Sequence, residues 1–552
     1  MSLSVSPLGI YVVPKFSKQP KRNIIRPNFK GAVPKKVCPT KMNLDFAKYK
    51  PLSKMLGGVT LFIHNLNIAE KLKSNYSKEE FEDLYDYTKE QGTFDYVENN
   101  KTGLVKTSFI EPEENQLMSD LVWITDSCHN MDLVKEKEPE RCTEIFNKVT
   151  EFYDAQQGAF DYAIANPHEY NWNGLYWAGE QKVGIGHCYI PETKEAHPWY
   201  PKTRLESVGN YLQTAADLIS SGMKGEKFGY KTSEDVPDSV INAISNTTAY
   251  LKALHYPTAR SCGAWEEQTF VYSLTSDTSI INEGFRNIMK LMYEDTDNQE
   301  LLSLRERIYN SKHGDVFRDR AGLEALLQAG EKRISENPNV ETLPKIDYQV
   351  SPDDAKSLER QYDAAMSFMP QTETIVHGDV YEDAIAKMAM LDELAEALVR
   401  DNGAIRYAGD AYLKLDSHTD KEKKSEGYEA EWFLVSEISK GYGAVVRQLG
   451  KYLKEHPEDE ERATALLNKA LALETEYINR SYARITPEGM TKANGYPCPG
   501  FKVPEAYEAV TTVDGEVKYV PGAHPLTWAE SSLKSASDMF LDNLKRVESL
   551  WK

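Results

Sequence analysis

Two glutamates, far apart in the chain, stand in sequence surroundings that favour acid–base chemistry. Glu266 follows Trp265 and precedes Glu267. An apolar ring and a neighbouring carboxylate both raise a carboxyl pKa, which keeps a general acid protonated near neutral pH. Glu505 follows the Gly- and Pro-rich segment 494–504, and such a loop carboxylate can act as a general base toward water. The structural alternatives are a glutamate stabilised by the dipole of a first helical turn and an ordinary solvent-facing loop glutamate.

Other aromatic, acidic and basic residues gather in predicted loops and at the starts of the helices that follow them. They are Trp123, Asp126, Arg406, Asp410, Trp432 and Trp528. Arginine and aspartate side chains can hydrogen-bond the hydroxyls of a sugar, and a tryptophan ring can stack on a sugar ring. The structural alternative for each is a loop salt bridge or a packed tryptophan. No P-loop, HExxH, GxSxG or EF-hand pattern is present, so none of those chemistries is indicated.

The elements that must position these residues are helices. From about residue 75, apolar residues recur at three- and four-residue steps, as in the stripe from Val435 to Leu449. This pattern predicts helices over residues 76–91, 137–165, 203–222, 238–255, 268–292, 317–336, 352–367, 378–401, 430–450, 459–481 and 526–550. Ser77 and Glu80 have the spacing of a capping box. Strand-like alternation is scarce, and its exception is a predicted hairpin over 509–520 around Asp514-Gly515.

Composition narrows the partners that the chain can have. A net charge of −20 over 552 residues disfavours nucleic acid and anionic membranes and suits a neutral ligand such as an oligosaccharide. No secretory signal and no membrane-spanning run of about 18 apolar residues is visible. The six cysteines are scattered, as expected for reduced thiols. We therefore expect a cytoplasmic protein.

The first 44 residues differ from the rest of the chain. They hold nine Lys or Arg, six Pro and no Asp or Glu. This basic arm either lies across the acidic body or serves as a targeting or partner-docking tail. The predicted division is a basic arm with a lead-in segment over residues 1–75, followed by one helical domain over 76–552.

The candidate residues belong to a longer series of motifs in a fixed order. The series runs through residues 100–104, 123–126, 201–206, 265–267, 406–410, 432–433, 504–507 and 525–528. It resembles glycoside hydrolase family 15, the glucoamylases, over about residues 80–550. It resembles as closely the glucoamylase-like domain of the phosphorylase kinase alpha and beta subunits.

The resemblance implies an all-α fold, an (α/α)6 barrel of the six-hairpin glycosidase type, with its site at one end of the barrel. It implies an inverting, exo-acting hydrolase that releases glucose from α-linked glucosides such as malto-oligosaccharides, glycogen or trehalose. Glu266 would be the general acid and Glu505 the general base, and neither a cofactor nor a metal is needed. An inverting pair requires about 6.5–9.5 Å between its carboxyl groups.

The resemblance also implies a set of substrate contacts. These are Trp123, Asp126, Trp199, Arg204, Glu206, Trp265, Glu267, Arg406, Asp410, Trp432 and Trp528. Two positions depart from the family pattern, because Thr125 stands where Arg is usual and Glu206 stands where Asp is usual. These departures keep open an alternative function, a non-catalytic carbohydrate-sensing module like the kinase subunits.

Overall fold

The structure, a computed structural model, describes most of the chain between residues 50 and 550. The described residues are 50–99, 101–108, 121–169, 177–178, 181–182, 184–197, 203–265, 273–336, 338, 340–341, 361–410, 429–492, 496–511, 517–522 and 526–550. Trp199, Glu266 and Glu267, three of the predicted site residues, lie outside these ranges, as does the basic arm.

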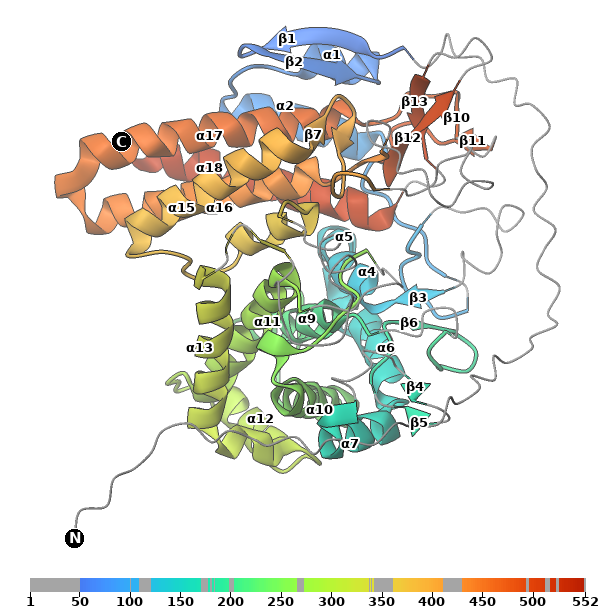
Figure 1. Cartoon of the computed structure of the whole chain (residues 1–552), viewed down its shortest axis with the longest axis vertical. Helices are drawn as coiled ribbons and strands as arrows, with labels where there is room; N and C mark the ends of the chain where they lie inside the picture. Colours follow the sequence, from blue (N-terminus) through green and yellow to red (C-terminus); the bar gives the residue numbers. More distant parts are fainter. Residues whose placement is uncertain are drawn as a thin grey trace, which may run out of the picture. The chain divides into compact units, whose positions relative to one another are not determined.

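Six helical elements form a closed ring within the described part of the chain (Figure 1). They are α4 (Ile124–His129) continued by α5 (Met131–Lys137), α9 (Leu205–Met223), α11 (Thr275–Tyr293), the 3₁₀ helix η5 (Ala364–Gln371), α16 (Val435–Glu455) and α18 (Thr527–Leu550). Each element packs against the next in this order, and α18 closes the ring by contacting both α4 and α5.

A second set of helices covers this ring from outside and alternates with it along the chain. It consists of α2 (Lys78–Glu90), α6 (Cys142–Asp154), α10 (Asp238–Leu254), α13 (Arg320–Glu336), α15 (Val380–Leu398) and α17 (Glu460–Ala483). Each outer helix packs on at least one inner element, as α17 does on α16 and α18. Two further helices, α7 (Gln157–Ala165) and α12 (Gln299–Tyr309), lie against α10. The predicted all-α (α/α)6 barrel is therefore confirmed.

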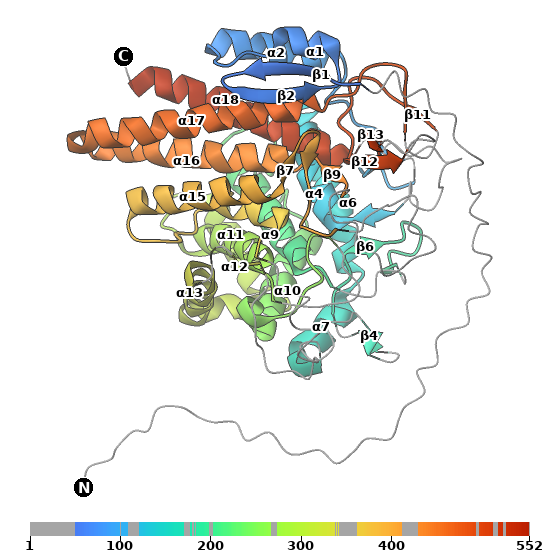
Figure 2. The same ribbon diagram turned by 45° about the horizontal axis from the view of Figure 1, so that its top comes forward.

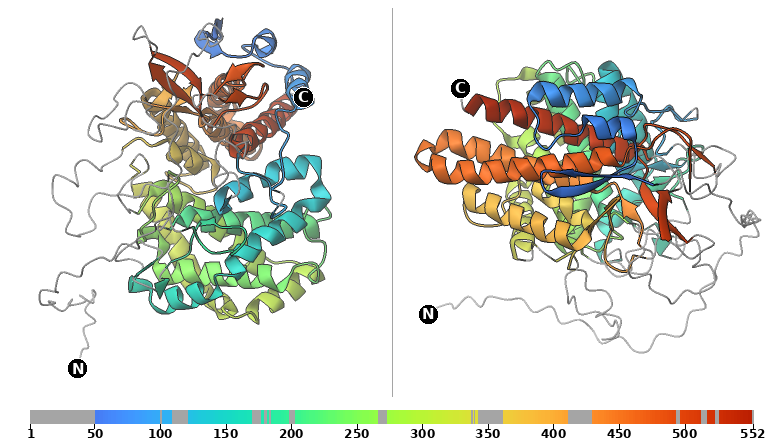
Figure 3. Two further views of the ribbon diagram at one scale, coloured as in Figure 1. Left: turned by 90° about the vertical axis from the view of Figure 1, so that its right-hand side faces the viewer. Right: turned by 90° about the horizontal axis from the view of Figure 1, so that it is seen from above.

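The helices on the two sides of the ring run in different directions. Figure 2 shows α15, α16, α17 and α18 side by side. In the left view of Figure 3, the green helices of the first half lie across the page, whereas the gold and orange helices are seen nearly end-on. Neighbouring inner helices still approach closely where glycines meet, since a Cβ at Gly284 of α11 would lie only 2.3 Å from the carbonyl oxygen of Gly209 in α9.

Local sequence signals account for many helix positions. The predicted apolar stripe of α16 is buried from Val435 to Leu449. At the start of α2, the Ser77 hydroxyl accepts a hydrogen bond from the Glu80 backbone N–H, and the Glu80 carboxylate accepts one from the Ser77 N–H. This reciprocal capping box satisfies two backbone donors that a helix start otherwise leaves unpaired.

Other helices differ from the prediction for identifiable reasons. The periodicity gave no sign of α4, because all but one of its residues are buried, polar ones included, and no apolar stripe stands out. The predicted helix 268–292 begins only at Thr275. Leu274 is the N-cap of α11, with an extended backbone; its carbonyl oxygen accepts from the Thr278 N–H and, at 2.8 Å, from Arg333 of α13, which also donates to the Ser273 carbonyl. Residues 266–272 are not described.

Short strands connect the helices at one end of the ring. A five-stranded sheet has the order β13 (Val517–Pro521), β12 (Ala506–Thr511), β9 (Glu431–Trp432), β8 (Gly403–Ala404) and β7 (Val399–Arg400). The antiparallel pairing of β12 with β13 agrees with the predicted hairpin. Smaller pairs are β3 (Val122–Trp123) with β6 (Cys188–Tyr189), β4 (Trp177–Ala178) with β5 (Gln181–Lys182), and β10 (Met490–Thr491) with β11 (Pro497–Cys498).

The segment before α2 is part of the folded body. It forms the hairpin of β1 (Leu52–Leu56) and β2 (Val59–Ile63), followed by α1 (Leu66–Lys71). Both β2 and α1 pack on α17, and the His64 N–H donates to the Ala483 carbonyl at 3.0 Å. Among the described residues, no helix has the length and hydropathy that a membrane span requires.

Candidate functional site

The predicted site residues that the structure describes gather where the inner helical elements begin. Trp123 and Asp126 lie at the start of α4, Arg204 and Glu206 at the start of α9, and Trp528 in the first turn of α18. Trp265 precedes α11, and the residues 406–410 and 431–432 lie in the connections leading to α16. We call this end of the ring the rim: residues 122–126, 203–206, 261–265, 273–277, 341, 361–363, 402–410, 429–434, 503–508 and 526–528.

Arg406 is the centre of one cluster at the rim. Its Nε and Nη2 donate to the two carboxylate oxygens of Asp410, both at 2.6 Å, and both side chains are buried. Its guanidinium carbon lies 4.7 Å from the ring centroid of Trp432 and 5.5 Å from that of Trp265. A bidentate ion pair and two aromatic faces fix the plane of the guanidinium, which is the geometry that arginine uses for specific polar recognition.

The two tryptophans of this cluster also contact each other. Their ring centroids are 6.1 Å apart at an interplanar angle of 44°. The indole N–H of Trp265 donates to Asp363 Oδ1 at 2.7 Å, and Asp363 itself caps η5 by accepting from the Ala365 N–H. This hydrogen bond orients the Trp265 ring. Asp363 was not among the predicted residues, although a capping aspartate before an apolar run could have marked it.

A second cluster lies at the starts of α4 and α9. Arg204 Nε donates to Glu206 Oε1 at 2.6 Å, and the Thr125 hydroxyl donates to the same oxygen at 3.2 Å. Among the described residues, no hydrogen bond reaches the other oxygen of Glu206, although this side chain is buried. Thr125, at the position where the family pattern has Arg, thus contacts the other residue that departs from the pattern.

Further acidic groups, absent from the predicted set, lie next to these clusters. Burial, with the charge of Glu206, raises the pKa of Asp277 well above its ordinary value. Burial, with the charge of Asp363, raises the pKa of Glu341 to about 7. Raised carboxyl pKa values are typical of sites that hold protons near neutral pH. The position of Asp277, in the first turn of the buried helix α11, was the one available signal.

The loop that carries Glu505 is held by a buried arginine. Arg484 donates to the carbonyl oxygens of Glu431 and Pro504, both at 3.1 Å, and also to that of Asn402. The Tyr507 hydroxyl donates to the Arg484 carbonyl at 2.9 Å. These bonds tie the connection before β12 to the connection before α16.

Two further contacts complete this support. The Phe433 N–H donates to the Glu505 carbonyl at 3.1 Å, directly after Trp432. On the other side, His64 stacks on Tyr507 with ring centroids 4.1 Å apart. Glu505 itself is half-buried. Sequence reasoning missed both Arg484 and His64, because their roles depend on contacts with residues far away in the chain.

The remaining predicted residues occupy different parts of the rim. Trp528 is buried in a stack with His129 (4.8 Å) and Phe368 (6.1 Å). Trp123 and Asp126 are buried at the start of α4. Since Glu266, Glu267 and Trp199 are not described, their roles and the carboxyl separation stay predictions. The described residues contain no group of three or more His, Cys, Asp or Glu side chains that could hold a metal ion.

Comparisons with known proteins find similarity only at the level of structure. The sequence matches no family model and has no significant match among curated proteins. A wild-type glycosidase is similar at 12% identity and a TM-score of 0.49, over 86% of this chain and all of that chain. A glucoamylase from Saccharomycopsis fibuligera is similar at 13% identity and a TM-score of 0.48, over 86% of this chain and 98% of that one.

A third solved structure, a bacterial glucoamylase complexed with acarbose, is 11% identical with a TM-score of 0.40, over 81% of this chain and 53% of that chain. At such identities a shared activity does not follow from similarity alone. The (α/α)6 barrel is established by the helix contacts of this chain, and the argument for its activity rests on its own rim.

Proposed function

We propose that this protein is an inverting, exo-acting glycoside hydrolase that releases glucose from α-linked glucosides. Glu266 is the general acid and Glu505 the general base. The proposal draws on the order of the sequence motifs and on the geometry of the rim.

One observation carries the proposal: the rings of Trp265 and Trp432 lie 6.1 Å apart. Trp265 immediately precedes Glu266 in the chain. Trp432 is paired across β9 and β12 with Ala506, the neighbour of Glu505. The two glutamates are 505 − 266 = 239 residues apart in the sequence. The contact between the Trp265 and Trp432 rings therefore links the backbone next to one glutamate with the backbone next to the other. Such convergence is what a two-carboxylate mechanism requires.

The chemistry follows from the two carboxyl groups. Glu266, kept protonated by the Trp265 ring and by Glu267, gives its proton to the glycosidic oxygen as the bond to the anomeric carbon breaks. Glu505 accepts a proton from a water molecule, whose oxygen attacks the anomeric carbon from the opposite face. The product is β-glucose, because the configuration is inverted, and the two carboxyl groups exchange their protonation states in each turnover.

The proposed substrate contacts orient the bound sugar. Arg406, fixed by Asp410 and by the rings of Trp265 and Trp432, faces the sugar hydroxyls with a defined plane. The rings offer apolar faces for the sugar. Asp126, Arg204, Glu206, Glu267, Trp123, Trp199 and Trp528 complete the proposed set. Holding a sugar in one orientation lowers the entropic part of the barrier.

The test is glucose release from a panel of α-linked glucosides by wild type, Glu266→Gln and Glu505→Gln. Glu488→Gln, which changes an exposed glutamate in the 484–505 segment, is the matched control. We expect each of the two site variants to lose about 10²- to 10⁴-fold in rate, and the control to match wild type. NMR of the fresh product should show the β-anomer. α-Glucose as the first product would exclude inversion, and full activity in either site variant would exclude the assigned role.

A non-catalytic, carbohydrate-sensing function is the second candidate, and one observation favours it. The charged groups expected to grip the sugar bind one another instead, since Asp410 accepts from Arg406 through both oxygens and Glu206 accepts from Arg204 and Thr125. A sensor would bind a malto-oligosaccharide in calorimetry and release no glucose from any substrate in the panel. That result would replace the hydrolase proposal.

A further inference from the structure

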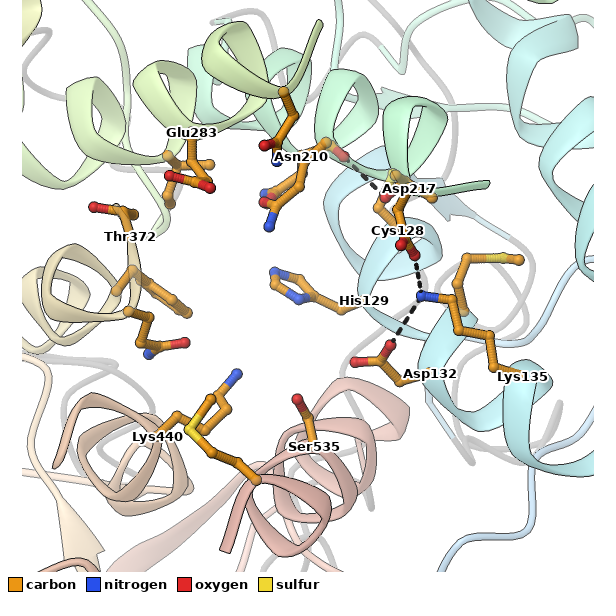
Figure 4. A pocket seen from close by; sticks show the side chains of 18 residues that line it. Cys128, His129, Asp132, Lys135, Asn210, Asp217, Glu283, Thr372, Lys440 and Ser535 are labelled. Carbon is orange, nitrogen blue, oxygen red and sulfur yellow. Dashed lines mark hydrogen bonds and ion pairs between the residues drawn. The ribbon is translucent and has the colours of Figure 1, made fainter. Parts of the chain in front are cut away.

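A second polar space lies further along the same inner helices. This inner cavity of about 350 Å³ is lined by residues of every inner element, including His129, Asn210, Phe368, Lys440 and Ser535. Figure 4 shows the labelled side chains arranged around its open centre, with the imidazole of His129 projecting into it. On α9, α11 and α18, the lining residues come after those that form the rim. The inner cavity is therefore distinct from the candidate site.

The lysines of the inner cavity are neutralised by carboxylates around them. Lys135 lies 2.5 Å from Asp217 and 3.5 Å from Asp132, and Figure 4 shows both interactions as dashed lines. Lys440 lies 2.7 Å from Glu437, which is fully buried beside the cavity. Each cation thus already has an opposite charge within the protein.

The remaining ionisable groups are also paired or neutral, although the carboxylates around the cavity outnumber its lysines, since Lys135 has two aspartate partners. Glu283 forms an ion pair of 2.7 Å with Arg286. Burial lowers the pKa of His129 to about 4, so its imidazole is neutral near neutral pH. An ionic ligand would have to break one of these pairs, which costs more than it gains in a partly enclosed site. The charge pattern therefore disfavours an anion, and a neutral ligand is the class that leaves every pair intact.

Hydrogen-bonding side chains line both the buried part of the inner cavity and its more exposed part. Asn210 is only 6% exposed, lines the cavity, and has a side-chain N–H₂ with no hydrogen-bond partner among the described residues. A buried amide left in this state costs about 1–3 kcal/mol, and a bound acceptor would remove that cost. The more exposed amides of Gln213 and Asn287 and the hydroxyl of Ser535 offer donors and acceptors further out.

Apolar groups complete the lining. The ring of Phe368 and the side chain of Ile280 are buried at its wall, and they suit the C–H face of a small ring. A volume of about 350 Å³ lies at the lower end of the range for small-molecule sites, roughly 300–1,000 Å³. We propose that the inner cavity binds a small, neutral, polyhydroxylated molecule of the monosaccharide class. This second site does not depend on the proposed hydrolase activity.

Two side chains that line the inner cavity also contact a residue of the rim. His129 and Phe368 line the inner cavity and also stack with Trp528, a predicted sugar contact. A ligand that fixes the His129 ring also fixes the ring stacked on it.

The test is equilibrium dialysis of the full chain against radiolabelled D-glucose, with the number of bound molecules as the readout. Ser535→Phe places a ring in the half-exposed part of the lining, and Ser549→Phe, an exposed position on the same helix α18, is the matched control. We expect Ser535→Phe to bind one glucose fewer than wild type, and Ser549→Phe to match wild type. This loss of one is expected whether wild type binds one glucose or two, so it is independent of the candidate site.

A second variant tests the hydrogen bond that we expect between the Asn210 amide and the ligand. Asn210→Leu keeps the size of the side chain and removes its donor, and we expect about tenfold weaker binding of one glucose. Glucose 6-phosphate should bind the same site at least about tenfold more weakly than glucose, because the cations are already paired. Unchanged stoichiometry in Ser535→Phe with an unchanged melting temperature, or tighter binding of the phosphate ester, would overturn the proposal.

Discussion

Within the described residues, the rim holds buried carboxylates with no cation in direct contact, in addition to Glu206 and Asp410, which are paired with arginines, whereas Glu437 beside the inner cavity is paired with a lysine. At the rim, burial raises the pKa of Glu341 and of Glu431 to about 7, in the case of Glu431 despite hydrogen bonds from Asn402. Beside the inner cavity, burial also acts to raise the pKa of Glu437, but the charge of Lys440 and the hydrogen bonds from Lys440 and Ser532 outweigh it, and the pKa falls below its ordinary value.

The difference arises from where the chain places its cations. Among the described residues, no Lys or Arg forms a direct ion pair with Asp277, Glu341 or Glu431, whereas Glu437 has Lys440 at 2.7 Å. Burial raises the pKa of carboxylates that have no cation beside them, and raised carboxyl pKa values are typical of proton-transfer sites. Paired carboxylates stay ionised and neutralise their surroundings. The rim is thus suited to chemistry, and the inner cavity to binding an uncharged molecule.

Breaking the pair beside the inner cavity should have the largest effect. Glu437→Gln leaves Lys440 buried without its counter-charge, and we expect the free energy of unfolding near pH 7 to fall by about 3–5 kcal/mol. The folded pKa of Glu437 is lowered, so its contribution is present above the ordinary value of 4.5 and is lost as the pH falls through the folded pKa. Denaturant unfolding at several pH values should therefore show the two proteins converging in acid. A difference in the free energy of unfolding that is the same at every pH would contradict the ion pair between Glu437 and Lys440.

Removing the support of the Glu505 loop should have the next largest effect. Arg484→Met leaves buried carbonyl groups of Glu431 and Pro504 without donors, for an expected loss of about 2–4 kcal/mol. Because Arg484 acts through Glu505, kcat should fall more than KM changes. Arg480→Met, which breaks a half-buried pair with Glu476 on α17, is the control and should leave kcat unchanged. Equal changes in kcat and KM would indicate a general loss of structure.

The rim carboxylate Glu431 should respond to pH in the opposite direction from Glu437. Its folded pKa is raised from 4.5 to about 7, so the folded state holds an extra proton in this window, and stability falls as the pH rises through it. Glu431→Gln can still accept from Asn402 and cannot ionise. We expect it to match wild type near pH 5 and to exceed it by about 1–3 kcal/mol near pH 8. Parallel pH profiles for the two proteins would show that the pKa of Glu431 is the same in the folded and unfolded states.

The smallest effect is expected at Thr125. Thr125→Val keeps the shape of the side chain and removes one hydrogen bond to Glu206, which Arg204 still holds. We expect a loss of about 1 kcal/mol in stability and less than about tenfold in glucose release. A larger loss of release would mean that the Thr125 hydroxyl contacts the substrate.

Much of the fold could be predicted because its signals are local. The stripe of α16 and the capping box of α2 involve residues within a few positions of one another. The signals failed where burial is nearly complete, as in α4, and at the start of α11, where the carbonyl oxygens of Ser273 and Leu274 are bound by the distant Arg333. Neither condition is visible in a short window of sequence.

The contacts of the candidate site also fall into local ones, which could be predicted, and long-range ones, which could not. The pair of Arg406 and Asp410 spans four positions, so its members were predictable as neighbours. The contact between Trp265 and Trp432, and the support of Glu505 by Arg484 and His64, join residues that only the closed ring brings together.

The sequence by itself determined where most helices lie and which residue types gather at their starts, because backbone hydrogen bonding and apolar periodicity act over a few residues. Only the tertiary structure decided which rings touch, which carboxylates lack a cation, and that the ring encloses an inner cavity. These properties depend on burial and on the distances between charges, and both are set when α18 packs against α4 and α5 to close the ring.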